Sequence, residues 1–303
     1  MQIPKQSFRE LVDTRFPGLT EKIKKAIEES ERAFDKKPGR QESFLWEHTI
    51  QVASISQQLA ELEKIDPLVP TIAALFHDAG KFSGGRYHEN DKNEEETSAK
   101  LAERVLGESG MRAIGVRRVV SGLKALYQER ARRNPVASIV HDADFLSKFG
   151  AMGVANFFIK SALRGRTLRS ALLEHLSKDL TYAACLPLNM RTSSGKKIAV
   201  KKATDLLRYF RSLLDELREA RIADLRIRRV RIPHPLHKNR DLDVRLIVPR
   251  ACPECGGLWK ISWTTEKGLK CHRLNIESVC RQCGGSTEVS FCLPEIAPAQ
   301  KRA

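Results

Sequence analysis

Apolar residues recur at helical spacing through the first two thirds of the chain. Residues 44–62 show the clearest stripe, and Ser43 stands before it as an N-cap. Another helix is predicted to begin near Leu68, with Pro70 in its first turn, and to end at Gly80. The same spacing predicts further helices over residues 19–33, 93–107, 111–130, 136–149, 153–163, 168–179 and 196–221. Residues 1–222 are therefore predicted to form an all-α domain.

From residue 223 the pattern changes to the alternation of apolar and polar side chains that is typical of strands. Residues 225–232 and 241–248 predict one pair of strands, and residues 259–263 and 289–293 alternate in the same way. A length of 303 residues suits about two domains. We therefore predict a multidomain fold in which a small β domain over residues 223–303 follows the helical one.

Neither a membrane span nor secretion is indicated by the sequence. No run of 18 apolar residues occurs, and charged residues interrupt the first 20 positions, where a secretory signal would need an apolar core. The sequence therefore predicts a cytoplasmic protein.

The net charge of +16 is concentrated in the second half of the chain. Residues 1–150 contain 24 Lys+Arg and 23 Asp+Glu, whereas residues 151–303 contain 29 and 14. Such an electropositive region favours a polyanionic partner, most often a nucleic acid or a phosphate compound. Within it, residues 218–273 combine many arginines with Trp259 and Trp263, which predicts a nucleic-acid interface. The alternatives are a charged surface that only maintains solubility and tryptophans that only form a core.

Six of the seven cysteines lie between residues 252 and 292, and four of them form two matching segments. Cys252-Pro-Glu-Cys255-Gly-Gly and Cys280-Arg-Gln-Cys283-Gly-Gly each place two thiols two residues apart, followed by glycines that let the backbone turn. This spacing predicts a tetrahedral structural zinc site with four thiolate ligands. A redox pair is the alternative.

The cysteine segments and the surrounding alternation together predict a β zinc ribbon whose folding depends on the ion, because so short a region has little core of its own. The other three cysteines, Cys185, Cys271 and Cys292, do not fit the spacing and are predicted to be structural. Cys271 and the adjacent His272 are alternative ligands for the same ion.

A second group of residues able to bind a metal lies on the predicted helices. His48 is on the apolar face of its helix, and His77 and Asp78 stand together at the end of the next. A single such histidine is more often a core residue, but several together can hold one ion. A carboxylate from Asp142 or Asp144 would complete the set, and helical periodicity does not decide between them. Imidazole and carboxylate ligands without cysteine suit Mn²⁺, Mg²⁺, Fe²⁺, Co²⁺ or Ni²⁺ better than a closed zinc site.

This pattern resembles the HD-domain metal-dependent phosphohydrolases, whose signature is a histidine, a later His-Asp pair and a final aspartate. Here His48 is followed by Leu75-Phe-His-Asp-Ala-Gly-Lys81 and by Val140-His-Asp-Ala-Asp-Phe-Leu146. The resemblance covers roughly residues 30–220. It implies an all-α HD-type domain with the metal ligands His48, His77, Asp78 and, as the fourth, Asp144.

The resemblance also implies hydrolysis of a phosphomonoester or phosphodiester of a nucleotide or nucleic acid. Asp78 would orient the attacking water, and Lys81 would neutralise a phosphate oxygen unless it is only a surface lysine. Members of the similar branch that hold a second ion have a histidine near the position of Leu126. Leucine cannot ligate a metal, and His88 is the other candidate in that region, so we expect one ion rather than two.

A second hypothesis is a nucleic-acid-binding adaptor whose HD domain is structural or inactive. The basic region with its zinc ribbon supports it, because the catalytic domain of the family contains no such segment. Retention of all four metal-ligand residue types favours the enzyme instead.

Overall fold

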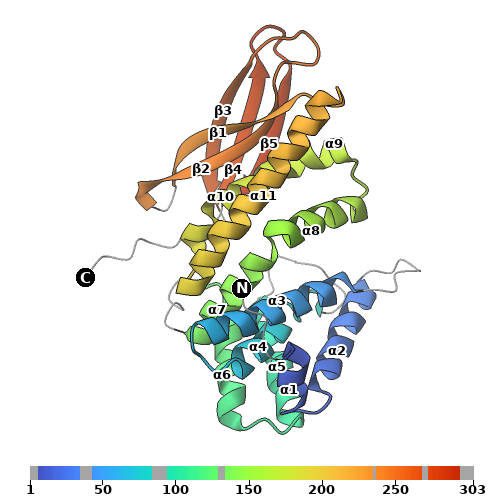
Figure 1. Ribbon diagram of the computed structural model, residues 1–303, viewed down its shortest axis with the longest axis vertical. Coiled ribbons are helices and arrows are strands. Elements are labelled where there is room, and N and C mark those ends of the chain that lie inside the picture. Colours follow the sequence, from blue (N-terminus) through green and yellow to red (C-terminus); the bar gives the residue numbers. More distant parts are fainter. Residues whose placement is uncertain are drawn as a thin grey trace. The chain divides into compact units, whose positions relative to one another are not determined.

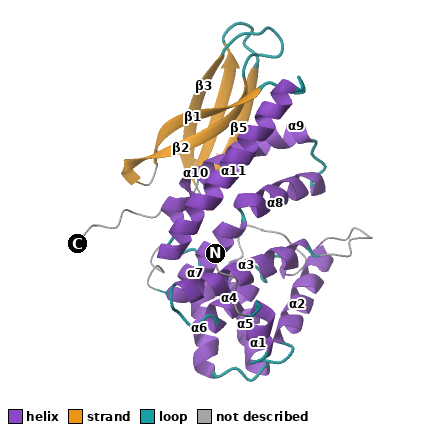
Figure 2. Cartoon of the chain, viewed as in Figure 1, coloured by secondary structure: helices purple, strands orange, loops and turns teal. Residues whose placement is uncertain are grey.

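The computed structural model describes residues 6–34, 43–83, 94–128, 134–234, 237–267 and 272–293 (Figure 1). The candidate ligands His88 and Cys271 lie outside these ranges. Helices fill the described chain as far as Glu219, and strands follow from Leu225 (Figure 2). This confirms the predicted fold class, a helical N-terminal region followed by a small β region. No helix of the described residues is both long enough and apolar enough to cross a membrane.

Compact packing divides the chain into two units. Unit 1 comprises Met1–Ser147 and Met190–Lys196, and unit 2 comprises Lys148–Asn189 and Lys197–Ala303. The change from helix to strand falls close to residue 222, as the sequence predicts. The compact units nevertheless divide elsewhere, because most of the helical chain after Ser147 groups with the strands.

Unit 1 is built from helices that bury their apolar faces against one another. Its helices are α1 (Phe8–Asp13), α2 (Leu19–Phe34), α3 (Phe44–Leu62), α4 (Leu68–Phe76), α5 (Glu94–Glu108), α6 (Ala113–Lys124) and α7 (Pro135–Ser147). The hydroxyl of Ser43 accepts a hydrogen bond from the backbone of Trp46 and caps α3, as predicted. The sequence analysis missed α1, a short helix that begins with a capping box between Ser7 and Glu10. Helices α3, α4 and α7 pack together in the core.

Unit 2 combines helices with two antiparallel sheets. Its elements are α8 (Gly150–Leu163), α9 (Leu168–Ala171), the π-helical turn η3 (Leu172–Leu176), α10 (Ser177–Asn189), most of α11 (Ser193–Glu219), β1 (Leu225–His234), β2 (His237–Pro249), β3 (Trp259–Lys267), β4 (His272–Cys280) and β5 (Ser286–Cys292). Strands β1 and β2 form one sheet, and β3, β4 and β5 form the other in that order. The predicted partnership of residues 225–232 and 241–248 is confirmed, whereas β4 was not predicted as a strand.

The helix predicted over residues 168–179 continues to Asn189 because it packs on β2. The hydroxyl of Ser177 accepts a hydrogen bond from the backbone N–H of Ile247 at 2.9 Å, and that of Thr181 accepts one from Arg245 at 3.0 Å. These contacts lie far apart in sequence, so local periodicity does not reveal them. The helix even accommodates Pro187 in its last turn.

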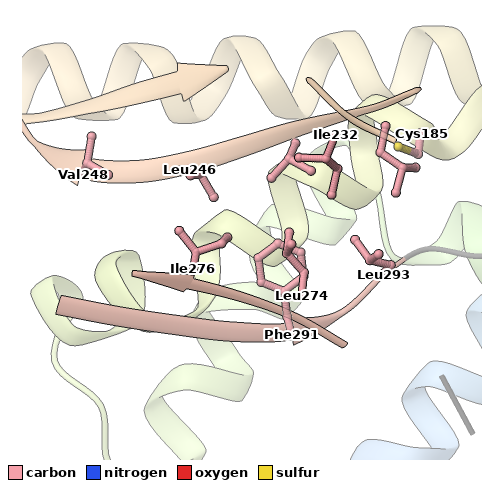
Figure 3. Close-up of a cluster of buried hydrophobic side chains, with 10 residues drawn as sticks. Cys185, Ile232, Leu246, Val248, Leu274, Ile276, Phe291 and Leu293 are labelled. Atoms are coloured by element: carbon pink, nitrogen blue, oxygen red, sulfur yellow. The ribbon is translucent and has the colours of Figure 1, made fainter. Parts of the chain in front are cut away.

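The two sheets of unit 2 share one hydrophobic core (Figure 3). Side chains from β1 and β2 face side chains from β4, β5 and the residue after β5. The buried members are Cys185, Ile232, Leu242, Val244, Leu246, Val248, Leu274, Ile276, Phe291 and Leu293. We call this set the two-sheet core.

Candidate metal centres

The first candidate centre lies in unit 1, where three segments bring their polar side chains together. His48 projects from α3, His77 and Asp78 follow the end of α4, and Asp144 lies on α7. All four residues are buried. Because α3, α4 and α7 pack against one another, these polar side chains converge in the interior of unit 1.

The ligand atoms of these residues point at a common centre. The Nε2 atoms of His48 and His77 are 3.4 Å apart, and His48 Nε2 is 3.2 Å from Asp144 Oδ1. The two imidazoles are each 3.7 Å from an oxygen of Asp78, and His77 Nε2 is 3.9 Å from Asp144 Oδ1. Nitrogen and oxygen ligands bound at 2.0–2.2 Å lie about 3.0 to 3.5 Å from one another in octahedral or tetrahedral geometry. The four residues therefore fit around one metal ion with little adjustment.

The surroundings of the two histidines bear on which atoms they can offer to a metal ion, and those of His77 leave a lone pair at Nε2. His77 Nδ1 lies 2.7 Å from the carbonyl oxygen of Ala74, and because a carbonyl only accepts, Nδ1 carries the proton. Burial lowers the pKa of His48 despite the nearby Asp144 and Asp78, which favours a neutral imidazole. Burial alone would raise the pKa of Asp78, but His77, Lys81 and His48 together hold it well below its usual value. The site thus offers imidazole nitrogens and the ionised carboxylate of Asp78 to a cation.

The end of α4 is fixed by a close approach to α5. The backbone N–H of Gly80 donates to the hydroxyl of Ser98 at 2.9 Å, and that hydroxyl donates to the carbonyl of His77 at 3.2 Å. A Cβ atom at Gly80 would lie 2.5 Å from the carbonyl oxygen of Glu94. Gly80 therefore does more than end a helix: it allows α5 to hold the His77-Asp78 pair in place.

The structure places Lys81 beside the cluster. Its Nζ lies 2.8 Å from Asp78 Oδ2, and its side chain remains partly exposed. The ammonium group is therefore within reach of both the buried carboxylate and solvent.

Asp142 and Asp144 have different surroundings although both are buried on α7. The carboxylate of Asp142 accepts hydrogen bonds from the backbone of Arg191 and from the backbone and hydroxyl of Thr192, at 2.7 to 3.1 Å. His141 Nδ1 lies 2.9 Å from the same carboxylate. Asp142 thus holds residues 190–196 in unit 1, while Asp144 faces the two histidines.

Tyr127 is a neighbour of the cluster that the sequence analysis missed. Its hydroxyl donates a hydrogen bond to Asp144 Oδ2 at 2.9 Å, which leaves Oδ1 facing His48. The adjacent Leu126 is fully buried in the core and offers no ligand. A tyrosine directly after Leu126 carries no metal-ligand signature, so the sequence offered no signal for it.

A cavity of about 660 Å³ lies next to α4 but away from these ligands. It is lined by α2, α5 and residues 79, 82 and 83, with Lys100 and Arg104 at its wall. None of the side chains of His48, His77, Asp78 and Asp144 lines this cavity, so we do not include it in the candidate metal centre.

The second candidate centre lies in unit 2 and consists of Cys252, Cys255, Cys280 and Cys283. The sulfurs of Cys252 and Cys283 are 3.6 Å apart, and those of Cys255 and Cys280 are 3.4 Å apart. Four thiolates at about 2.3 Å from a tetrahedral zinc ion lie about 3.8 Å from one another. The cluster therefore has the dimensions of a zinc site.

The two cysteine segments have the same backbone conformation. Gly256 and Gly284 have φ angles of 72° and 74°, which residues with a Cβ rarely adopt. In each segment the first cysteine donates its N–H to the carbonyl of the second glycine, from Cys252 to Gly257 at 2.9 Å and from Cys280 at 2.8 Å. Cys185 lies in the two-sheet core and Cys292 is disulfide-bonded, so neither residue belongs to this centre.

The residues predicted to bind nucleic acid have mixed surroundings. Trp259 is buried beside the cysteine cluster, whereas Trp263 is 42% exposed. Arg229 and Arg245 both donate to Asp243, and Arg250 pairs with Asp224. Part of the basic charge is therefore neutralised within unit 2.

Comparison with known proteins identifies the class of the helical region. Residues 45–148, which contain His48, His77, Asp78 and Asp144, match the HD domain family. This confirms the resemblance for that segment of the chain. Residues 45–148 therefore form an HD domain, and a β region with a four-cysteine cluster follows later in the chain.

Several solved structures are similar to this chain. One is a predicted HD superfamily hydrolase from an uncultured Thermotogales bacterium, with 20% identity over 70% of this chain and 99% of that one, at a TM-score of 0.47. An HD-superfamily hydrolase from Bacillus thuringiensis has 21% identity, coverage of 66% and 98%, and a TM-score of 0.47. YpgQ from Bacillus subtilis, in complex with ADP, has 20% identity, coverage of 65% and 94%, and a TM-score of 0.46. No curated protein matches the chain.

Proposed function

We propose that this protein is a metal-dependent phosphohydrolase that cleaves a phosphomonoester or phosphodiester of a nucleotide or nucleic acid. The convergence of His48, His77, Asp78 and Asp144 on one point within an HD domain carries the proposal. Their mixed nitrogen and oxygen donors suit Mn²⁺, Mg²⁺, Fe²⁺, Co²⁺ or Ni²⁺. When bound, such an ion acts as a Lewis acid toward a phosphoryl oxygen and makes a water molecule more acidic.

Three side chains of the protein have the remaining roles in the proposed reaction. Asp78 is ionised and accepts a hydrogen bond from the attacking water, which orients it toward phosphorus. Lys81, which already contacts Asp78, neutralises a nonbridging phosphate oxygen as a point charge. Tyr127 acts as a positioning residue, because its hydroxyl fixes the carboxylate of Asp144.

The test is turnover by metal-loaded protein on a panel of nucleotides, including ADP, cyclic dinucleotides, and DNA and RNA oligomers. We expect release of phosphate or shortened products, and loss of at least 100-fold in rate for Asp144→Asn. The matched control is Asp205→Asn, which removes an exposed carboxylate from α11 and should retain full activity. Absence of turnover with every metal and substrate, or equal activity of Asp144→Asn, would refute the enzyme.

We further propose that the HD site holds one ion, because Leu126 is a buried core residue and offers no ligand for a second. Elemental analysis of protein purified without chelator should show one such ion and one zinc per chain. The zinc belongs to Cys252, Cys255, Cys280 and Cys283 as a structural ion. Two ions at the HD site would contradict the proposal.

Residues 218–273 are proposed to bind nucleic acid, which would bring a polymeric substrate to the protein. The supporting observations are the excess of basic residues and the exposed Trp263. The alternative function, an adaptor with an inactive HD domain, predicts the same binding without turnover. Measuring both on one preparation separates the two hypotheses.

A further inference from the structure

Two arginines interrupt the apolar face of strand β1 that belongs to the two-sheet core. Strand register places Arg226 opposite Val248 and Arg228 opposite Leu246, and paired residues of neighbouring strands project from the same face. Val248 and Leu246 are both buried members of the core. Arg226 and Arg228 therefore project from the face that the rest of this sheet uses for hydrophobic packing.

These arginines lack the acidic partners found on the opposite face of the strand. There, Arg229 donates to Asp243 at 2.8 and 3.3 Å. Arg226 and Arg228 form no ion pair within the described residues, and the Nε of Arg226 is buried without a hydrogen-bond acceptor among them. No carboxylate of the described residues therefore neutralises these two partly buried guanidinium groups, so their charge is available to an anionic partner.

The facing sheet presents an aromatic ring at the border of the same core. Trp263 pairs with Ile276 in the register of β3 and β4, and Ile276 is a core member. Figure 3 shows Ile276 and Val248 at the same end of the cluster, away from Cys185. Trp263 is 42% exposed, unlike Trp259, so its indole face is available at that end.

We propose that this end of the two-sheet core, bordered by Arg226, Arg228 and Trp263, binds single-stranded nucleic acid. Arginines two apart on a strand are separated by about 6.7 Å, which suits two successive phosphates of an extended strand. A base stacks on Trp263, as bases do on the aromatic residues of single-strand-binding proteins. A duplex keeps its bases paired and offers Trp263 no free base to stack on.

The inference rests on the nucleic-acid partner proposed above and names the residues that contact it. Binding is measured by fluorescence anisotropy with a labelled 12-nucleotide oligomer across a series of salt concentrations. The full-length Asp144→Asn protein is the background, so that the oligomer is not cleaved. Zinc content and circular dichroism verify that each variant is folded.

Arg226→Gln together with Arg228→Gln should flatten the plot of log affinity against log salt by about 1.4, at about 0.7 per phosphate. Trp263→Ala should weaken binding by about 5- to 150-fold with little change in slope, and Trp263→Phe should restore part of the loss. The matched control is Arg229→Gln with Arg231→Gln, which removes the same charge from the other face of β1. It should change the slope by clearly less.

An equal effect of the control pair, stronger binding to a duplex than to a single strand, or normal binding by Trp263→Ala would each overturn the inference. Hydrolysis of small nucleotides by the protein with intact HD ligands, Arg226 and Arg228 is measured separately. Hydrolysis without oligomer binding would refute the binding surface alone. Oligomer binding without any hydrolysis would support the binding surface and refute the proposed enzyme.

Discussion

Substitution of Gly80 by alanine tests whether the contact between α4 and α5 holds the candidate metal site. The added Cβ would lie 2.5 Å from the carbonyl oxygen of Glu94, 2.9 Å from the backbone nitrogen of Ser98 and 2.9 Å from the Cβ of Thr97. Two of these contacts involve backbone, which cannot rotate away as the end of a long side chain can. Helix α5 must therefore move, and the hydrogen bonds of Ser98 to Gly80 and to His77 must lengthen.

Overpacking of this kind costs about 1–3 kcal/mol. With about 2–4 °C per kcal/mol for a unit of this size, the midpoint of thermal unfolding should fall by about 2–12 °C. Circular dichroism of the metal-free protein is the suitable assay, because a bound ion would add its own stabilisation. Affinity for Mn²⁺ or Ni²⁺ should fall as well, since His77 and Asp78 follow α4 directly.

Gly107→Ala is the matched control within the same pair of helices. Gly107 lies in α5, and a Cβ there would meet no atom within 4 Å. That substitution should stabilise the protein by about 0.5–1 kcal/mol, as alanine in place of glycine does in a helix. If Gly80→Ala unfolds at the wild-type temperature and binds metal equally well, the role assigned to the contact is wrong.

Three further predictions concern the two candidate centres. Asp144→Asn should lose the HD-site metal, whereas Asp142→Asn should keep it and lower the unfolding temperature, because it weakens the bonds that hold residues 190–196; elemental analysis and a thermal scan distinguish them. Tyr127→Phe should weaken metal binding by about 10- to 100-fold at unchanged stoichiometry in a metal titration, and full affinity would contradict its positioning role. Cys283→Ser should remove the zinc while leaving the HD-site metal bound, and loss of both metals from the elemental analysis would show that the centres are not independent.

The parts of the molecule fixed by local spacing could be predicted from the sequence. The two cysteine segments repeat the same six-residue pattern, so sequence alone indicated which four thiols converge. Helix α3, which has an apolar stripe and a cap at Ser43, was predicted to the residue. In both cases the physical cause acts within a few residues.

Features that depend on contacts distant in sequence could not be predicted in this way. The extension of α10 to Asn189 depends on hydrogen bonds that the hydroxyls of Ser177 and Thr181 accept from the backbone of β2. The grouping of α8 to α11 with the strands follows from packing across the whole of unit 2. Strand β4 alternates buried Leu274, Ile276 and Ser278 with less buried residues, but it carries too few large apolar side chains to stand out.

The buried and exposed faces of the arginine-rich strand β1 could not be assigned from its pattern of apolar and polar residues. Leu225 and Ile227 are apolar at odd positions, whereas Val230 and Ile232 are apolar at even positions. The apolar side of the strand thus changes face between residues 227 and 230, and either face could be the buried one. Only the register with β2 shows that Arg226 shares a face with the two-sheet core.

The sequence could not decide whether Asp142 or Asp144 is the metal ligand for a different reason. Helix α7 is buried around nearly its whole circumference, from Val136 to Ser147, so no exposed side exists to set the phase of its pattern. On such a helix, burial gives both carboxylates the same environment, and their neighbours decide what each does. The carboxylate of Asp142 has four hydrogen-bond donors around it, from His141, Arg191 and Thr192, whereas Oδ1 of Asp144 faces the Nε2 atoms of His48 and His77. A carboxylate surrounded by donors is already satisfied, whereas a carboxylate that faces two imidazole nitrogens can bind a cation together with them. We therefore propose Asp144, and not Asp142, as the fourth ligand.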